Sequence, residues 1–237
     1  MIARATAAVL LIAAAAPAAA ANLGVEASTD LRRRGLSWSD GSPAIEAWAS
    51  VPVTGGLSIE GGAATLRDSA RHGGADLLAE AALRYTRQSG AFSWWADVQG
   101  LGFVGASGEN YGQFRSGAAF GIGPVQLSGI ASWAPPQAAI GGSNVYVGGS
   151  VNFGIPLTPL TLRASAGHST GTDDGSGRAN RLRPGGDYSD FRFDADYVLG
   201  PVTLGASFTT TTISTRSSDQ YADHAGSRVL LRASLGF

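Results

Sequence analysis

Charged residues recur at alternate positions in the C-terminal third of the chain. Four of them stand two apart in one segment: Asp190, Arg192, Asp194 and Asp196. In a β-strand, residues two apart point to the same face. Arginine and carboxylate side chains in one row can form bidentate ion pairs or line a wet passage. The spacing therefore predicts one strongly charged strand face.

Two short motifs match known ligand-binding sequences, one for a dinucleotide and one for calcium, in residue type only. The segment Gly100–Gly105 matches the dinucleotide fingerprint GxGxxG, and Thr172–Gly177 carries oxygen donors that could suit calcium. The first lies inside an alternating strand pattern rather than at a strand-to-helix turn. The second lacks the spacing of a calcium loop. We therefore expect no cofactor and no metal site.

The three histidines, His72, His168 and His224, fall in or beside predicted loops. His168 is adjacent to Ser169 and near Asp173, which makes a hydrolytic set conceivable. Sequence neighbours on a loop need not converge, and no nucleophile motif accompanies them. We expect exposed loop histidines and no enzyme, with an outer-membrane lipase or protease as the alternative.

The elements that carry these residues are strands. In the last segment Val229, Leu231, Ala233, Leu235 and Phe237 are apolar, whereas most residues between them are small or charged. The same period of two recurs along the chain and predicts twelve strands. Their ranges are 23–36, 44–52, 57–66, 77–87, 91–105, 111–122, 125–134, 144–154, 160–168, 188–199, 202–212 and 227–237.

Connection lengths alternate between short and long, and both chain ends fall on the short side. A two-sheet sandwich has no reason to sort its loops in this way, whereas outer-membrane barrels join strands by tight periplasmic turns and longer external loops. The fold class is therefore an all-β, transmembrane, antiparallel up-and-down barrel of about twelve strands.

The two faces of the predicted barrel differ in kind. Aromatic residues on the apolar face fall near the two membrane interfaces. These are Tyr85, Phe92, Phe114, Phe120, Trp133, Phe153, Phe191, Tyr197, Phe208 and Phe237. The inward face carries nine acids and eight arginines. These are Glu26, Asp30, Arg32, Arg34, Glu46, Glu60, Glu80, Arg84, Asp97, Arg115, Arg163, Asp190, Arg192, Asp194, Asp196, Arg228 and Arg232. Unpaired charges are costly in a dry core, so a wet or ion-paired lumen is expected.

The chain ends and the composition indicate export. Residues 1–21 have one early positive charge, a short apolar stretch and small residues before a cleavage point after Ala20 or Ala21, as in a secretory signal. The barrel would then span residues 22–237. Cysteine is absent, and the net charge of −1 argues against a nucleic-acid partner.

The opening of the mature segment resembles the TorF family of porins. The matching residues are Arg32, Arg34, Gly35, Ser37, Ser39, Pro43 and Ala44, while Leu31 and Arg33 stand where that family usually has aromatic residues. The turns Gly123-Pro124-Val125 and Gly200-Pro201-Val202 extend the resemblance, and the terminal Phe237 resembles the signature that the outer-membrane assembly machinery reads. The resemblance implies a porin in the bacterial outer membrane.

We therefore expect a narrow, weakly selective channel for small hydrophilic solutes or ions, with the lipid bilayer and the assembly machinery as its other partners. A structural network of ion pairs is favoured over a selectivity filter, and a plugged structural or adhesive barrel is a further alternative. The residues expected at a constriction are Arg115, Arg163, Asp190, Arg192, Asp194, Asp196 and Arg232.

Overall fold

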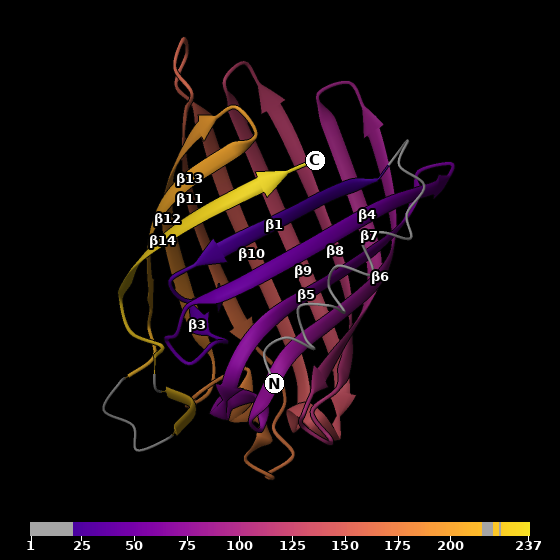
Figure 1. Cartoon of the computed structure of the whole chain (residues 1–237). Helices are drawn as coiled ribbons and strands as arrows, with labels where there is room; N and C mark the ends of the chain where they lie inside the picture. Colours follow the sequence, from indigo (N-terminus) through magenta and orange to yellow (C-terminus); the bar gives the residue numbers. More distant parts are fainter. Residues whose placement is uncertain (1–20, 215–219, 223) are drawn as a thin grey trace.

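The computed structural model describes residues 21–214, 220–222 and 224–237. Its main element is a closed antiparallel barrel of twelve strands, in which β1 pairs with both β14 and β4 (Figure 1). The strands are β1 Asn22–Ser28, β4 Ala44–Thr54, β5 Leu57–Ser69, β6 Ala75–Ser89, β7 Phe92–Val104, β8 Tyr111–Ile122, β9 Val125–Gln137, β10 Gly142–Gly154, β11 Leu160–Thr170, β12 Tyr188–Leu199, β13 Val202–Thr211 and β14 Arg228–Gly236.

The outer face of the barrel is apolar along every strand. Leu231 is 60% exposed and Phe193 is 58% exposed, as expected of side chains that face lipid rather than a protein core. Nine of the ten aromatic residues expected outside are exposed, and Tyr85 is partly covered by Trp94. Within the described residues, no helix has the length and apolarity that crossing a membrane would need.

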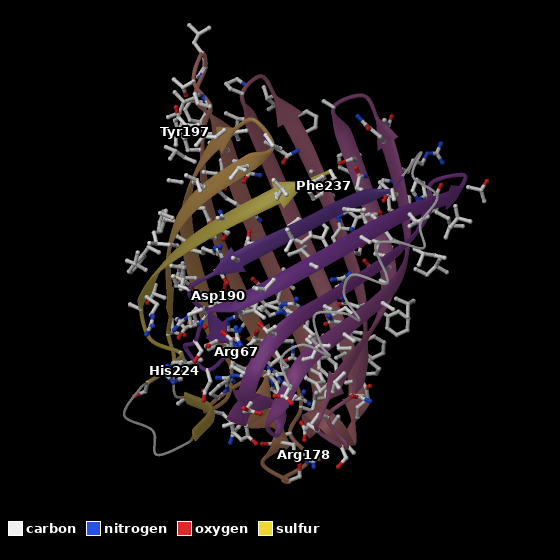
Figure 2. All side chains as sticks on the ribbon, in the orientation of Figure 1. Arg67, Arg178, Asp190, Tyr197, His224 and Phe237 are labelled. Atoms are coloured by element: carbon white, nitrogen blue, oxygen red, sulfur yellow. The ribbon has the colours of Figure 1, made fainter. Side chains whose placement is uncertain are left out.

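The two ends of the barrel have different connections, as predicted. Residues 55–56, 90–91, 123–124, 155–159 and 200–201 make the short turns, and the C-terminus lies at this short-turn end. The opposite end carries residues 29–43, 70–74, 105–110, 138–141 and 171–187 and the described residues between 212 and 227. We call it the long-loop end, although the connection 138–141 is shorter than the predicted loop 135–143 and shorter than the turn 155–159, because β9 and β10 extend further than predicted. Tyr197 and Phe237 lie toward the first end, whereas Arg67, Arg178 and His224 lie toward the second (Figure 2).

The first predicted strand, 23–36, is wrong beyond Ser28. Residues 29–43 instead form a two-stranded hairpin of β2 Arg32–Arg33 and β3 Leu36–Ser37, separate from the barrel sheet. The hairpin turns at Arg34 and Gly35, whose φ angles are +54° and +75°. Two successive residues with positive φ form the tight turn of a hairpin and interrupt an extended strand. We call residues 29–43 the lumenal hairpin.

A buried core fills the barrel at the long-loop end. It combines hairpin residues with the inward ends of several strands and with short helical turns in the loops: η1 Ala70–His72, η2 Ala138–Ile140, η3 Arg178–Arg181 and η4 Gln220–Ala222. Its larger members are Leu31, Leu36, Trp38, Leu66, Leu78, Leu101, Phe103, Tyr111, Ile140, Leu182 and Tyr188. We call this packed layer the cap. Nearly all of the predicted signal segment, residues 1–21, lies outside the described residues.

Candidate functional site

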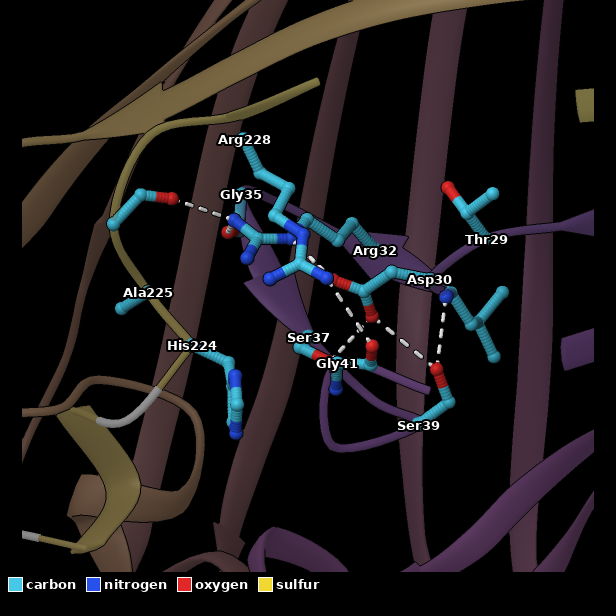
Figure 3. A network of polar contacts seen from close by, with 12 residues as sticks. Thr29, Asp30, Arg32, Gly35, Ser37, Ser39, Gly41, His224, Ala225 and Arg228 are labelled. Carbon is cyan, nitrogen blue, oxygen red and sulfur yellow. Dashed lines mark hydrogen bonds and ion pairs between the residues drawn. The ribbon is translucent and has the colours of Figure 1, made fainter. Parts of the chain in front are cut away.

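The base of the lumenal hairpin is organised by one buried carboxylate. Asp30 is 1% exposed, and its two oxygens lie 2.7 Å from Arg32 Nε and 2.5 Å from Ser37 Oγ (Figure 3). Ser39 Oγ also donates to Asp30 and accepts from the backbone N–H of Leu31. A buried carboxylate that accepts from this many donors fixes the local backbone.

Arg32 ties the hairpin to the last long loop. Its Nη1 donates to the carbonyl of Gly35 at 3.1 Å and to the carbonyl of Gly226 at 2.8 Å. Most of the residues behind the porin resemblance, including Arg32, Gly35, Ser37 and Ser39, thus belong to this hairpin. The motif therefore encodes an element that folds into the barrel, rather than a stretch of barrel strand.

Arg33 at the hairpin tip reaches the wall made by β4 and β6. Its Nη2 lies 2.6 Å from Glu46 Oε1, and its Nη1 lies 2.5 Å from Glu80 Oε1. The same guanidinium lies over the ring of Trp38, 4.9 Å from its centroid. Arg33 is therefore a charged strut between the hairpin and one side of the lumen.

Arg34 reaches a different part of the wall and finds neutral partners. Its Nη2 donates to Ser132 Oγ at 2.8 Å and to Gln113 Oε1 at 3.3 Å, and its guanidinium lies 4.5 Å from the ring centroid of Tyr146. The Tyr188 hydroxyl donates to the Arg34 carbonyl at 3.0 Å. Within the described residues, Arg34 forms no ion pair with a carboxylate.

Two cavities adjoin the hairpin tip, and both include Arg33 and Glu46 in their lining. The smaller, about 260 Å³, is polar and also borders Glu26 and Arg163. The larger, about 460 Å³, borders Arg34 and several aromatic rings of the cap. The Arg33–Glu46 pair therefore lies where the two spaces are divided.

Most of the residues predicted for the constriction gather on the wall of β11, β12 and β14. Arg192 Nε is 2.8 Å from Asp194 Oδ1, and Arg232 Nη2 is 3.1 Å from the same oxygen. Arg232 also binds Asp196 at 2.7 Å. Arg163 lies across from Asp194 in register and lines the smaller cavity.

Three predicted constriction residues, Arg115, Arg163 and Asp190, lie outside that ion-pair network. Arg115 is 2.8 Å from Asp97, which also binds Arg84, on the β6–β8 wall. Asp190 is near the hairpin tip, where a Cβ added at Gly35 would lie 3.1 Å from its Cβ. The structure thus divides the predicted set between two walls.

Arg33 is the residue that the strand pattern missed. In a continuous strand from 23 to 36 its side chain would point outward, because Arg32 and Arg34 point inward. The turn at Arg34–Gly35 ends the strand alternation, so Arg33 points into the lumen instead. The signal available in the sequence was the Arg-Gly pair followed by Ser37 and Ser39, which is compatible with a turn and its side-chain hydrogen bonds.

Buried arginines hold the loops of the cap together. Arg71 donates to the carbonyls of Ser37, Arg181 and Tyr221. Arg181 donates to the carbonyls of Glu109 and Ala139, and pairs with the Glu109 carboxylate at 2.8 Å. Loops distant in sequence are thereby joined into one layer.

His72 lies inside the cap between aromatic rings. Its ring centroid is 4.5 Å from that of Trp38 and 4.7 Å from that of Phe103. Its Nδ1 accepts a hydrogen bond from Arg181 Nη2 at 3.1 Å. Burial, followed by the positive charges of Arg181 and Arg71, lowers the pKa of His72 well below its usual value. The imidazole is therefore neutral, and it is buried, not exposed as the sequence suggested.

Large lumenal side chains lie flat against the wall over glycines. A Cβ at Gly167 would be 2.1 Å from the hydroxyl oxygen of Tyr146, and one at Gly117 would be 2.7 Å from the ring of Trp95. A side chain at either position would push the ring toward the lumen. These glycines therefore keep the space beside the hairpin open.

The hydrolytic alternative finds little support in the rim geometry. His168 Nδ1 lies 3.0 Å from Ser189 Oγ, not beside Ser169, whose hydroxyl is buried. Asp173 accepts from the backbone N–H of Gly175, as in a solvated turn. Gly100 and Gly102 lie within β7, toward its C-terminal end, and not at a strand-to-helix turn. Among the described residues, no group of three or more His, Cys, Asp or Glu side chains could hold a metal ion.

A family model described as "Bacterial protein of unknown function (Gcw_chp)" matches residues 13–230. The chain belongs to the Gcw_chp family. A search of curated proteins gives no match. The family description names no activity, so membership of the family does not assign a function to the chain.

Two solved structures with a similar fold are named as porins. The KdgM porin has a TM-score of 0.58 at 8% identity, with 91% of this chain and 99% of that one covered. The NanC porin has a TM-score of 0.59 at 10% identity, with 91% and 98% covered. At such identities the likeness concerns the fold: a porin-like barrel.

Proposed function

We propose that this protein is an outer-membrane channel through which small hydrophilic solutes or ions diffuse, with the lumenal hairpin as its constriction. The observation that carries the proposal is the hairpin tip, which enters a charged lumen and contacts two parts of its wall: β4 and β6 through Arg33, and β8 and β9 through Arg34. A barrel of twelve strands lies between small filled barrels and wide aqueous pores. An inserted hairpin in such a barrel leaves a narrow passage.

The lumen has the character of a wet space toward the short-turn end. Trp48, on the same face as Glu46 and Ser50, remains 42% exposed. Ser128 and Ser150 form a hydrogen bond across β9 and β10 at 2.7 Å. Polar side chains of this kind line aqueous passages more often than packed cores.

Charge selectivity in this channel is weak, because acids and arginines are mixed along the wall. The expected constriction set, Arg115, Arg163, Asp190, Arg192, Asp194, Asp196 and Arg232, contains four arginines and three aspartates. Several are neutralised in pairs, as in Arg192–Asp194. A local excess around Arg163, which has no ion-pair partner among the described residues, would set the remaining preference.

The location and partners follow from the outer face and the chain ends. An apolar belt with exposed aromatic residues suits the lipid bilayer of a Gram-negative outer membrane. The resemblance of the hairpin motif to the TorF family of porins supports the same role. Residues 1–21 would direct export, and Phe237 would present the chain to the outer-membrane assembly machinery.

The cap favours a second candidate, a plugged structural or adhesive barrel. Its core residues Leu36, Trp38 and Phe103 are at most 5% exposed, so the long-loop end is densely packed. A channel would need this layer to be porous or to open. A plugged barrel would need neither.

Solute uptake by proteoliposomes separates the two candidates. We expect liposomes carrying the folded protein to swell in small sugars and amino acids, at rates that fall steeply with solute size. Liposomes carrying an equally folded variant with the hairpin tip shortened should swell faster. No swelling with either protein would favour the plugged barrel.

A further inference from the structure

We propose that the larger cavity beside the hairpin tip binds a small organic anion that carries a carboxylate on a flat ring. The inference extends the proposed channel function by naming a class of solute. It rests on that function only because the anion would reach the cavity through the channel. The cavity of about 460 Å³ lies within the size range of small-molecule sites.

Arg34 supplies the charge for such a ligand. Its guanidinium lines the cavity and is oriented by Ser132, Gln113 and the ring of Tyr146. These partners are neutral, so they position the cation without neutralising it. A guanidinium has five N–H donors, and the two hydrogen bonds seen here use only Nη2. Donors therefore remain for a carboxylate, which matches the guanidinium fork.

The other arginines that border the cavity are already paired with carboxylates. Arg33 is held by Glu46 and Glu80, and Arg115 is held by Asp97. Asp190 lies close by, with its Oδ1 3.5 Å from the Tyr146 hydroxyl, and it forms no ion pair with Arg34. Asp190 reduces the local positive potential, which favours a monoanion held by direct hydrogen bonds over a highly charged polyanion.

The remaining wall suits a planar, partly apolar body. Tyr146 is kept along the wall by Gly167, and its face already stacks on Arg34. Trp38, Tyr111 and Leu182 border the same space from the cap side. Rings and guanidinium planes favour flat ligands by stacking and cation–π contact. A carboxylate anchored at Arg34 would place an attached ring among these groups.

The test is equilibrium binding by the full-length folded protein in detergent, which requires no conduction. Benzoate is the probe, benzamide is its neutral isostere, and acetate is the anion without a ring. Calorimetry should give tighter binding for benzoate than for either, and benzoate should change the fluorescence of Trp38. Equal binding of benzoate and benzamide would overturn the proposal without any variant.

Variants then locate the site. Arg34→Gln should weaken benzoate binding at least ~10-fold, as expected for a lost charge-assisted contact, whereas Arg163→Gln, in the smaller cavity, should leave it unchanged. Tyr146→Leu should weaken benzoate and spare acetate. The assignment would be refuted if Arg163→Gln lost benzoate binding while Arg34→Gln retained it. It would also be refuted if the wild-type barrel bound no benzoate. Liposome swelling without benzoate binding would refute the anion site and leave the proposed channel function supported.

Discussion

Arg33 and Arg34 are neighbours in the chain, but Arg33 has acidic partners and Arg34 has neutral ones. Arg33 pairs with both Glu46 and Glu80, so it acts as a strut whose single positive charge is outnumbered by two carboxylates. Arg34 is held by Ser132, Gln113 and a tyrosine ring, and none of these partners carries a negative charge. The turn between β2 and β3 is what sends the two side chains to different walls.

Asp30 should be the residue on which the hairpin depends most. Asp30→Ala would leave the Arg32 guanidinium buried without its carboxylate, and removing one partner of a buried pair costs about 3–5 kcal/mol. Unfolding in urea should show that loss, while the exposed Asp173→Ala stays within about 0.5 kcal/mol of wild type. Similar stabilities for both variants would mean that the hairpin is not anchored through Asp30.

Gly167 should control the position of Tyr146. In Gly167→Ala the new methyl group would meet the tyrosine hydroxyl at 2.1 Å, so the ring must move off the wall at an overpacking cost of about 1–3 kcal/mol. The matched lumenal variant is Gly121→Ala, which would meet nothing within 4 Å. Thermal unfolding in detergent should separate the two variants, and equal midpoints would contradict the packing described.

At the scale of elements, the cap should weaken in acid because of His72. Its lowered pKa keeps the folded imidazole neutral, whereas the unfolded histidine takes up a proton near pH 6.5. Stability is therefore complete above that pH and is lost as the pH falls below it, by up to about 1.4 kcal/mol per pH unit.

Hydrogen exchange at the Trp38 amide, which donates to the Leu31 carbonyl, reports this opening. After correction for intrinsic exchange rates, protection should fall between pH 7 and pH 5 in the wild type and fall less in His72→Gln. The glutamine keeps an acceptor for Arg181 without titrating in this range. Equal pH dependence in both proteins would mean that His72 is not the source of the acid sensitivity.

The strands could be predicted from the sequence because lipid outside and water inside impose a period of two. The range 188–199 was predicted to the residue, and so was 111–122. Residues 29–36 kept the same alternation of polarity, yet they left the sheet at Ser28. Buried hydrogen bonds to Asp30 outweigh continued pairing there, and such tertiary contacts have no periodic signature.

The candidate site was predictable only in part for the same reason. Arg192, Asp194, Asp196 and Arg232 share one wall because register and alternation place them there. The roles of Arg33 and His72 depend on which wall or layer a folded loop meets. Neither follows from spacing along the chain.

At the scale of the whole molecule, the two barrel faces should respond differently to charge. Leu231→Arg and Phe193→Arg would place arginine against lipid, at a cost of about 2–4 kcal/mol near the midplane. Ser234→Arg and Thr203→Arg would point into the lumen and should cost less. Folding into liposomes, followed by the mobility shift of unboiled samples in SDS gels, measures both pairs. Equal yields would show that the faces are misassigned.

Single-channel recording in planar bilayers tests the central claim, that the lumenal hairpin constricts a conducting barrel. Wild-type protein should give small, weakly selective current steps. Arg33→Ala removes the strut between the two cavities and should give larger steps, whereas Arg87→Ala, exposed near the short-turn end, should not. Large wild-type current steps that are unchanged in Arg33→Ala would contradict the constriction by the hairpin. A folded barrel that gives no current steps would contradict the channel function itself.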